Sequence, residues 1–181
     1  ERKANQKLLA RAIINSKHNQ NKNPLVSVVI PTYNRAKVLT ERTIPSVLKQ
    51  TYQNFELIII GDHCTDNTEQ LIKEKFCDRR ISFINLPKRG KYPKNPHLRW
   101  LVAGGIPRNE GLKRARGEWI APLDDDDEFS KDHLEVLLNY ASVSGCDLVY
   151  GAVLMEKTPR KWERVGSYPL SNGTICHLSA M

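Results

Sequence analysis

Residues 26–35 read VSVVIPTYNR, an apolar, β-branched run that ends in a short polar segment. Residues 25–30 have the length and composition of a buried strand, and the rest of the predicted fold is built outward from it. Two later stretches repeat the arrangement, LIIIGDHCTD at 57–66 and IAPLDDDDE at 120–128. Since parallel strands present their carboxyl ends at one edge of a sheet, we expect the three polar segments to share one rim.

Strand-like and helix-like segments alternate along the rest of the chain. The predicted strands are residues 25–30, 56–60, 81–86, 118–123 and 147–155, and the predicted helices are 38–50, 66–76, 106–116 and 130–144. Such alternation is typical of an α/β fold with a Rossmann-like, mostly parallel sheet flanked by helices. Residues 87–105 are rich in Pro, Lys, Arg and Gly, and we expect a long functional or mobile loop there.

The first 23 residues differ from this pattern. Apolar residues recur at roughly helical spacing within residues 2–17, and polar residues follow at 19–23. We interpret residues 1–23 as an amphipathic helix and linker that contact a membrane surface, a neighbouring domain or the main fold. The main domain is expected over residues 24–181.

The chain carries a net charge of +8, from 28 Lys and Arg against 20 Asp and Glu. A nucleic acid, an anionic lipid surface or a phosphate-bearing substrate would each account for this excess. The acids at 124–128 interrupt a continuous basic track, so we expect no nucleic-acid partner.

The apolar runs and the cysteines indicate where in the cell we expect the protein. No stretch of about eighteen apolar residues could span a membrane, and the opening residues are polar, unlike a secretory leader. The four cysteines lack CxxC spacing, which argues against a structural zinc site and favours reduced thiols. We expect a cytoplasmic protein, with contact at the inner face of a membrane left open.

Residues 124–128 place five carboxylates directly after a predicted strand. Packed carboxylates repel one another unless a cation is present, and hard oxygen ligands suit Mg²⁺ or Mn²⁺. Because Mg²⁺ usually takes only one or two protein carboxylates, we predict a metal that bridges the protein to a diphosphate. The alternative is a solvated acidic turn that caps the next helix.

Asp62 follows the second strand of the predicted rim. Its carboxylate could accept a hydrogen bond from a nucleobase N–H or from ribose hydroxyls, as acids do after strands in dinucleotide-binding folds. The alternative is an Asx turn that only starts the next helix.

Taken in order, these segments resemble the family-2 glycosyltransferases of the GT-A fold, over about residues 26–151. Residues 28–35 look like the opening strand and nucleotide loop of that family, and residues 46–59 are similar to its next helix and strand. Residues 61–66 stand where the family usually shows DDGSTD. RNEGL at 108–112 and ARGEWI at 115–120 match the segment before the metal motif, and LDDDD at 123–127 fits the DXD motif itself.

The resemblance implies a set of site residues. The implied substrate-binding residues are Pro31, Thr32, Tyr33, Arg35, Asp62, Arg108, Asn109, Asp124 and Asp125. The implied metal ligands are Asp126 and Asp124. In this assignment residues 31–35 line the base and ribose pocket, and Asp62 hydrogen-bonds the base, most often uracil.

The resemblance also implies the reaction. A sugar would pass from a nucleoside-diphosphate sugar, most often a UDP-sugar, to a saccharide, lipid-linked or other hydroxyl acceptor. Mn²⁺ or Mg²⁺ would assist the leaving diphosphate, and direct displacement would invert the anomeric centre while an Asp or Glu takes the acceptor proton. Residues 25–155 would bind the donor and residues 156–181 would begin the acceptor part. No acid after Asp127 matches the base motif, so we expect the base beyond residue 181 and an acceptor-binding part that is incomplete here.

Two alternatives are weighed against this interpretation. A nucleotidyltransferase would need a Gly-rich phosphate loop after the first strand, where residues 31–35 contain no glycine. A non-catalytic nucleotide-sugar-binding module would keep the fold without the base. Gly61, His63 and Cys64 depart from DDGSTD but leave Asp62 and Asp66 in register, so base identity stays open beyond a preference for uracil.

Overall fold

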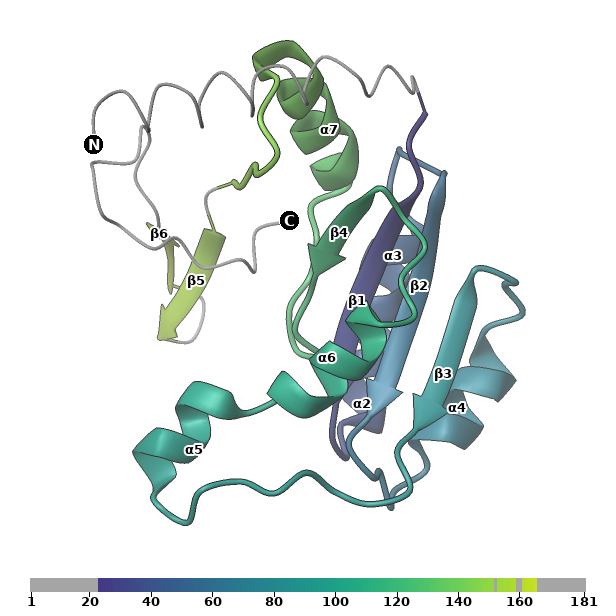
Figure 1. The fold of residues 1–181 in the computed structure, drawn as a ribbon, viewed down its shortest axis with the longest axis vertical. Coiled ribbons are helices and arrows are strands. Elements are labelled where there is room, and N and C mark those ends of the chain that lie inside the picture. The colour runs from purple at the N-terminus through teal and green to yellow at the C-terminus, as the bar shows by residue number, and fades with distance from the viewer. Residues whose placement is uncertain (1–22, 152, 159–160, 166–181) are drawn as a thin grey trace, which may run out of the picture.

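The computed structural model describes residues 23–151, 153–158 and 161–165 (Figure 1). Four parallel strands form a central sheet in the order β3-β2-β1-β4. Their bounds are β1 Val26–Thr32, β2 Phe55–Gly61, β3 Ile81–Asn85 and β4 Trp119–Pro122. The predicted mostly parallel sheet is therefore confirmed.

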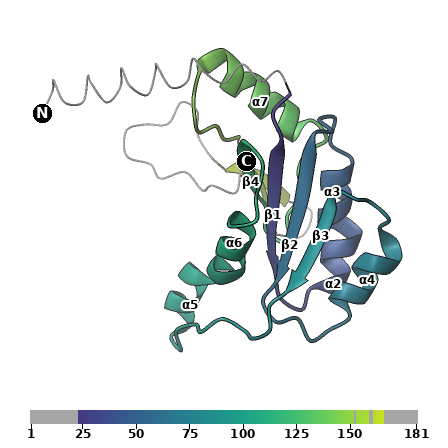
Figure 2. The same ribbon diagram turned by 45° about the vertical axis from the view of Figure 1, so that its right-hand side comes forward.

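Helices cover both faces of this sheet (Figure 2). One face carries α2 (Ala36–Val38), the π-helical η1 (Leu39–Thr43), α3 (Ile44–Leu48) and α4 (Thr68–Lys75). The other face carries α6 (Gly105–Leu112), from which α5 (Pro96–Val102) extends, and α7 (His133–Ser144) lies near the amino ends of the strands. The chain steps outward from β1 to β3 and then crosses back to β4, so the direction of crossing reverses between β1 and β4.

The core is built around β1 and β2, which are buried along their whole length. Strands covered on both faces need apolar side chains on both faces, which explains the continuous apolar runs in the sequence. Burial of each such side chain stabilises the fold by roughly 1.5–3 kcal/mol. Gly111 lets α6 approach β1 closely, because a Cβ there would lie 2.4 Å from Cγ1 of Val29.

Three predictions from the sequence were wrong in detail. Residues 87–105 are not all loop: they contain α5, because the Asn95 side chain accepts hydrogen bonds from the backbone N–H groups of His97 and Leu98 and caps it. The helix predicted over 38–50 is interrupted by η1. The helix predicted over 106–116 ends at Leu112.

The strand predicted at 147–155 does not extend the parallel sheet. β5 (Val153–Thr158) begins later and pairs antiparallel with β6 (Lys161–Val165) in a separate two-stranded sheet. The apolar stretch before it is used otherwise, since Val149 packs against Leu137 and Ala141 of α7.

The expected amphipathic helix at 2–17 and much of the expected acceptor part at 156–181 lie outside the described residues. In the described ranges, Cys64, Cys77 and Cys146 are all free thiols. Within those same ranges, no helix combines the length and the hydropathy that a membrane crossing would need.

Glu56 forms a buried polar junction between β1, β2 and the turn before β4. Its Oε1 accepts hydrogen bonds from the Ser27 hydroxyl at 2.6 Å and from the Arg116 backbone N–H at 2.7 Å. Its Oε2 pairs with the Arg116 guanidinium at 2.7 Å. Burial acts to raise the pKa of Glu56, but the hydrogen bonds from Ser27 and Arg116 outweigh burial and lower it.

We predict that Glu56→Gln lowers the free energy of unfolding by about 2 kcal/mol at neutral pH, since it removes the charge from a buried carboxylate that accepts hydrogen bonds from Ser27 and Arg116. The lowered pKa means that the Glu56 contribution is present above the ordinary glutamate pKa of about 4.3 and is lost as the pH falls through the folded value. Urea unfolding of both proteins between neutral and acidic pH would measure this. A stability difference that does not shrink in acid would contradict the assignment.

Candidate functional site

A cavity of about 610 Å³ opens at the carboxyl ends of β1, β2 and β4. The residues singled out from the sequence that line it are Pro31, Thr32, Tyr33, Arg35, Asp62, Arg108, Asp124, Asp125 and Asp126. Asn109 is not among the lining residues. The cavity lies where the crossing direction reverses between β1 and β4, which is the usual ligand position in open α/β sheets.

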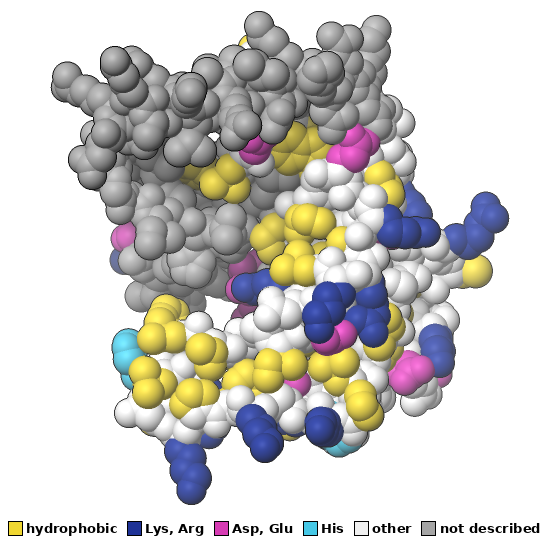
Figure 3. All heavy atoms as spheres, in the orientation of Figure 1, with side chains coloured by type: hydrophobic (Ala, Val, Ile, Leu, Met, Phe, Trp, Pro, Cys, Tyr) yellow, Lys and Arg dark blue, Asp and Glu magenta, His cyan; other side chains and the backbone are white. Residues whose placement is uncertain are grey.

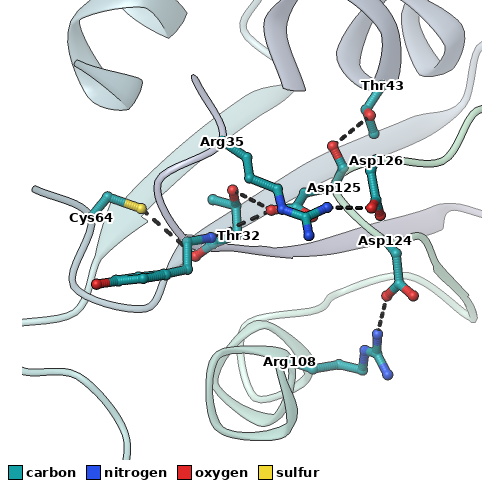
Figure 4. Close-up of polar contacts among 9 residues, drawn as sticks. Thr32, Arg35, Thr43, Cys64, Arg108, Asp124, Asp125 and Asp126 are labelled. Carbon is teal, nitrogen blue, oxygen red and sulfur yellow. Dashed lines mark hydrogen bonds and ion pairs between the residues drawn. The ribbon is translucent and has the colours of Figure 1, made fainter. Parts of the chain in front are cut away.

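Thr32 and Asp125 join the ends of β1 and β4 beneath this cavity (Figure 4). The Thr32 hydroxyl donates to Oδ2 of Asp125 at 2.7 Å, and both residues are buried. Arg35 lies 3.4 Å from Oδ1 of the same carboxylate. Burial raises the pKa of Asp125, although the hydrogen bond from Thr32 and the charge of Arg35 act against it. Asp125 thus links the ends of β1 and β4, because its buried carboxylate contacts Thr32 and Arg35.

Asp124 and Asp126 point away from that buried contact and toward two different arginines (Figure 4). Asp124 forms an ion pair with Arg108 of α6, and Asp126 forms one with Arg35 from the loop after β1. The aspartate side chains are 46% and 51% exposed, so each is accessible at the cavity rim. The hydrogen bond that Arg35 donates to Asp126 raises the pKa of Arg35, despite the opposing effect of burial.

These carboxylates could supply only part of the ligand set of a metal ion. Among the residues that the structure describes, no three His, Cys, Asp or Glu side chains form a group that could hold a metal ion. A fully protein-built cage is therefore absent from the described ranges. Two accessible carboxylates nevertheless match the donor set of Mg²⁺ or Mn²⁺ when water and phosphate oxygens supply the other ligands.

The acidic turn is held in place from the helical side by polar residues that sequence analysis missed. The Thr43 hydroxyl, at the end of η1, donates to the Asp125 carbonyl at 2.9 Å. Further along, Gln50 donates to the Ser130 carbonyl at 2.6 Å and accepts from the Leu134 N–H at 3.0 Å. Buried Thr43 and Gln50 lie seven residues apart, a helical spacing that could have indicated a polar contact with one partner segment.

Asp62, at the end of β2, is almost wholly buried and contacts the segment that sequence analysis predicted as a long functional or mobile loop. Its Oδ1 accepts from the Gly90 backbone N–H at 2.9 Å, and its Oδ2 accepts from the Tyr92 hydroxyl at 2.7 Å. The Arg89 guanidinium lies 3.5 Å from the centre of the Tyr33 ring. Arg89 and Tyr92 therefore belong to the cavity wall. The mixture of Lys, Arg and aromatic residues at 88–100 is the sequence feature that could have indicated their role.

The outer wall of the cavity comes from α5 and the turn before α6. Trp100 and Leu101 line the cavity and remain largely exposed. Figure 3 shows apolar side chains gathered over the α5 region, with Lys and Arg side chains along the same edge. Gly104 adopts a left-handed conformation with φ of 73° at the N-cap of α6, which turns the chain back beneath Pro31.

The open parallel sheet, with paired carboxylates and arginines where the crossing direction reverses, defines an α/β domain with a ligand cavity at its carboxyl edge. Comparison with known families gives the finer assignment. The model described as glycosyl transferase family 2 matches residues 27–95 and 97–174. The chain belongs to glycosyl transferase family 2.

Individual relatives agree with this assignment. The poly(ribitol-phosphate) beta-N-acetylglucosaminyltransferase TarP of Staphylococcus aureus is 38% identical over 128 residues, which cover 70% of this chain and 36% of TarP. The GalNAc(5)-diNAcBac-PP-undecaprenol beta-1,3-glucosyltransferase of Campylobacter jejuni is 34% identical over 136 residues, 74% of this chain and 40% of that protein. The chain therefore spans less than half the length of these relatives.

A solved structure shares the fold. The crystal structure of S. aureus TarS 1–349 in complex with UDP-GlcNAc superposes with a TM-score of 0.54 at 28% sequence identity. The match covers 65% of this chain and 31% of that one. The GT-A fold predicted from the sequence is confirmed.

We predict that Thr32→Val lowers the free energy of unfolding by about 1–3 kcal/mol, because the nearly isosteric change leaves buried Asp125 without its shortest hydrogen bond. Thr32→Ser keeps the hydroxyl and serves as the control, with a loss of less than about 1 kcal/mol expected. Urea unfolding measures both. Equal stability of the Val and Ser variants would show that the contact does not hold the rim.

Proposed function

We propose that this chain supplies the nucleotide-sugar-binding part of a glycosyltransferase that moves a sugar from a nucleoside-diphosphate sugar to a hydroxyl acceptor. One observation carries the proposal: the accessible carboxylates of Asp124 and Asp126 lie on the same cavity as Thr32 and Asp62. The relatives support it, since one is named as an N-acetylglucosaminyltransferase and TarS was solved with UDP-GlcNAc.

The donor would lie across the strand ends. In our proposal Tyr33 and Asp62 recognise the base, and uracil is the preferred one. Arg108 supports an anionic group nearby, because its buried Nε has no hydrogen-bond partner within the described ranges. A guanidinium with an unused donor favours negative charge beside it. The net charge of +8 favours a phosphate-bearing ligand in the same way.

Asp124 and Asp126 would hold Mn²⁺ or Mg²⁺ between them and the diphosphate. Such an ion neutralises charge that develops on the leaving nucleoside diphosphate. Arg35 and Arg108, which pair with these aspartates in the described structure, would then be available to phosphate oxygens. In this proposal Asp125 would keep the hydrogen bond from Thr32 and so support the proposed ligands on either side of it.

The acceptor side is proposed more broadly. The relatives' names include a ribitol-phosphate polymer and an undecaprenol-linked saccharide, which supports a saccharide, lipid-linked or other hydroxyl acceptor. Direct displacement would invert the anomeric centre, with a carboxylate as the base. We assign that role to no acid of the described residues.

We predict that Asp126→Asn weakens Mn²⁺-dependent UDP binding by about tenfold or more, equivalent to about 1.4 kcal/mol, while metal-free binding is unchanged. Titration calorimetry with and without Mn²⁺ measures both. Glu128→Gln is the matched control: Glu128 belongs to the same acidic run and also pairs with an arginine, Arg42, but does not line the cavity. Parent-like Mn²⁺ dependence in Asp126→Asn would reject the ligand assignment.

Donor choice is tested by thermal unfolding with UDP-, GDP- and dTDP-sugars, each with and without Mn²⁺. A ligand at about a hundred times its Kd stabilises the folded state by about 2.7 kcal/mol, which raises the Tm by roughly 5 °C or more for a chain of this size. We expect UDP-sugars with Mn²⁺ to give the largest rise. If no nucleotide sugar raises the Tm, the proposed function is wrong. Binding without any transfer by the longer protein would favour a non-catalytic module.

A further inference from the structure

Asp62, the carboxylate that we propose recognises the base, already accepts hydrogen bonds from other residues of the protein. Gly90 donates its backbone N–H to Oδ1 of Asp62 at 2.9 Å, and Tyr92 donates its hydroxyl to Oδ2 at 2.7 Å. The Asp62 side chain is only 4% exposed as a result. Both carboxylate oxygens therefore have donors from the segment between β3 and α5.

Arg89, from the same segment, covers the neighbouring aromatic surface. Its guanidinium carbon lies 3.5 Å from the centre of the Tyr33 ring, which is direct stacking contact. No other flat group fits between the two planes at that separation. The Nε of Arg89 also lies 3.7 Å from Oδ2 of Asp62. Arg89 is itself 47% exposed, so it lies at the cavity mouth and not in the core.

The chemistry of these contacts matches that of the expected ligand. A guanidinium is planar, stacks on aromatic faces and carries N–H donors toward a carboxylate. Uracil likewise offers a flat ring and a ring N–H. We propose that residues 89–92 form a strap that occupies the nucleobase subsite in the free protein and must leave it before the nucleotide binds. This inference rests on the proposed function, since it takes Tyr33 and Asp62 as the base subsite.

The strap is built so that it can be displaced. Residues 86–95 contain no helix or strand, and the side chains of Lys88, Arg89 and Lys91 are exposed. Gly90 is needed for the close approach, because a Cβ there would lie 2.5 Å from Cδ1 of Ile106. Few buried apolar contacts hold such a segment, so opening it costs much less than unfolding the domain.

Competition of this kind has a definite thermodynamic consequence. The apparent affinity for a ligand equals its intrinsic affinity multiplied by the fraction of molecules in which the subsite is open. Weakening the strap therefore strengthens the binding of any ligand that needs the base subsite. A ligand that contacts only the metal and phosphate positions is unaffected. If Arg89 and Tyr92 instead bound the nucleotide directly, the same substitutions would weaken binding.

The first experiment compares Arg89→Ala, Tyr92→Phe and the control Lys91→Ala, which removes an exposed cation from the same segment. UDP and inorganic pyrophosphate are titrated calorimetrically, each with Mn²⁺. We expect both strap variants to bind UDP at least about threefold more tightly, with pyrophosphate binding unchanged and Lys91→Ala like the parent. Unchanged or weaker UDP binding in both strap variants would show that residues 89–92 do not compete with the nucleotide for the base subsite.

Hydrogen exchange of the unmodified protein gives a second, independent measurement. If the strap leaves, addition of UDP breaks the bond from the Gly90 amide to Asp62, and exchange in residues 89–92 becomes faster. If the segment closes over the nucleotide as a ligand, exchange there becomes slower, and the proposal is wrong. Should neither the parent nor the strap variants bind UDP, GDP or dTDP, the proposed function fails and the strap assignment falls with it. If UDP binds but hydrogen exchange in residues 89–92 does not change, the strap proposal is wrong and the proposed function is unaffected.

Discussion

A buried hydrogen bond from Thr32 to Asp125 is the contact on which the arrangement of the site depends. It joins the carboxyl ends of two neighbouring strands that are far apart in the sequence, and it does so where the direction of chain crossing reverses. At that point the crossing helices leave in opposite directions, so the strand ends are not covered. The cavity exists because of this topology, and the contact fixes the relative position of its two sides.

The same contact explains why adjacent aspartates have different environments. The Asp125 side chain is buried beneath the rim, whereas Asp124 and Asp126 remain about half exposed. Thr43 holds the Asp125 carbonyl from the opposite side, so both the side chain and the backbone of Asp125 are fixed. An anchored central residue gives its two neighbours defined directions, and each of them carries an accessible carboxylate at the rim.

The charged side chains at the rim are paired with other groups of the protein. Each exposed aspartate has an arginine, and Asp62 has the Gly90 amide and the Tyr92 hydroxyl. Burial and the hydrogen bond to Asp62 raise the pKa of Tyr92, so its hydroxyl stays protonated as a donor. A ligand that brings a diphosphate, a metal ion and a base would replace these internal partners with equivalent ones. Binding would then exchange contacts without leaving a buried charge alone.

The parallel α/β sheet and the strand ends that carry the polar residues could be predicted from the sequence, because buried strands need continuous apolar runs and their ends need turns. The sequence also placed Asp62, Asp124 and Asp126 at one rim, since that follows from strand direction alone. Three features became visible only in the folded chain: Asp125 faces inward, Asn109 does not line the cavity, and Arg89 and Tyr92 contact Tyr33 and Asp62. Those outcomes depend on contacts between residues distant in the chain, and local composition carries no record of which distant partner a side chain will meet.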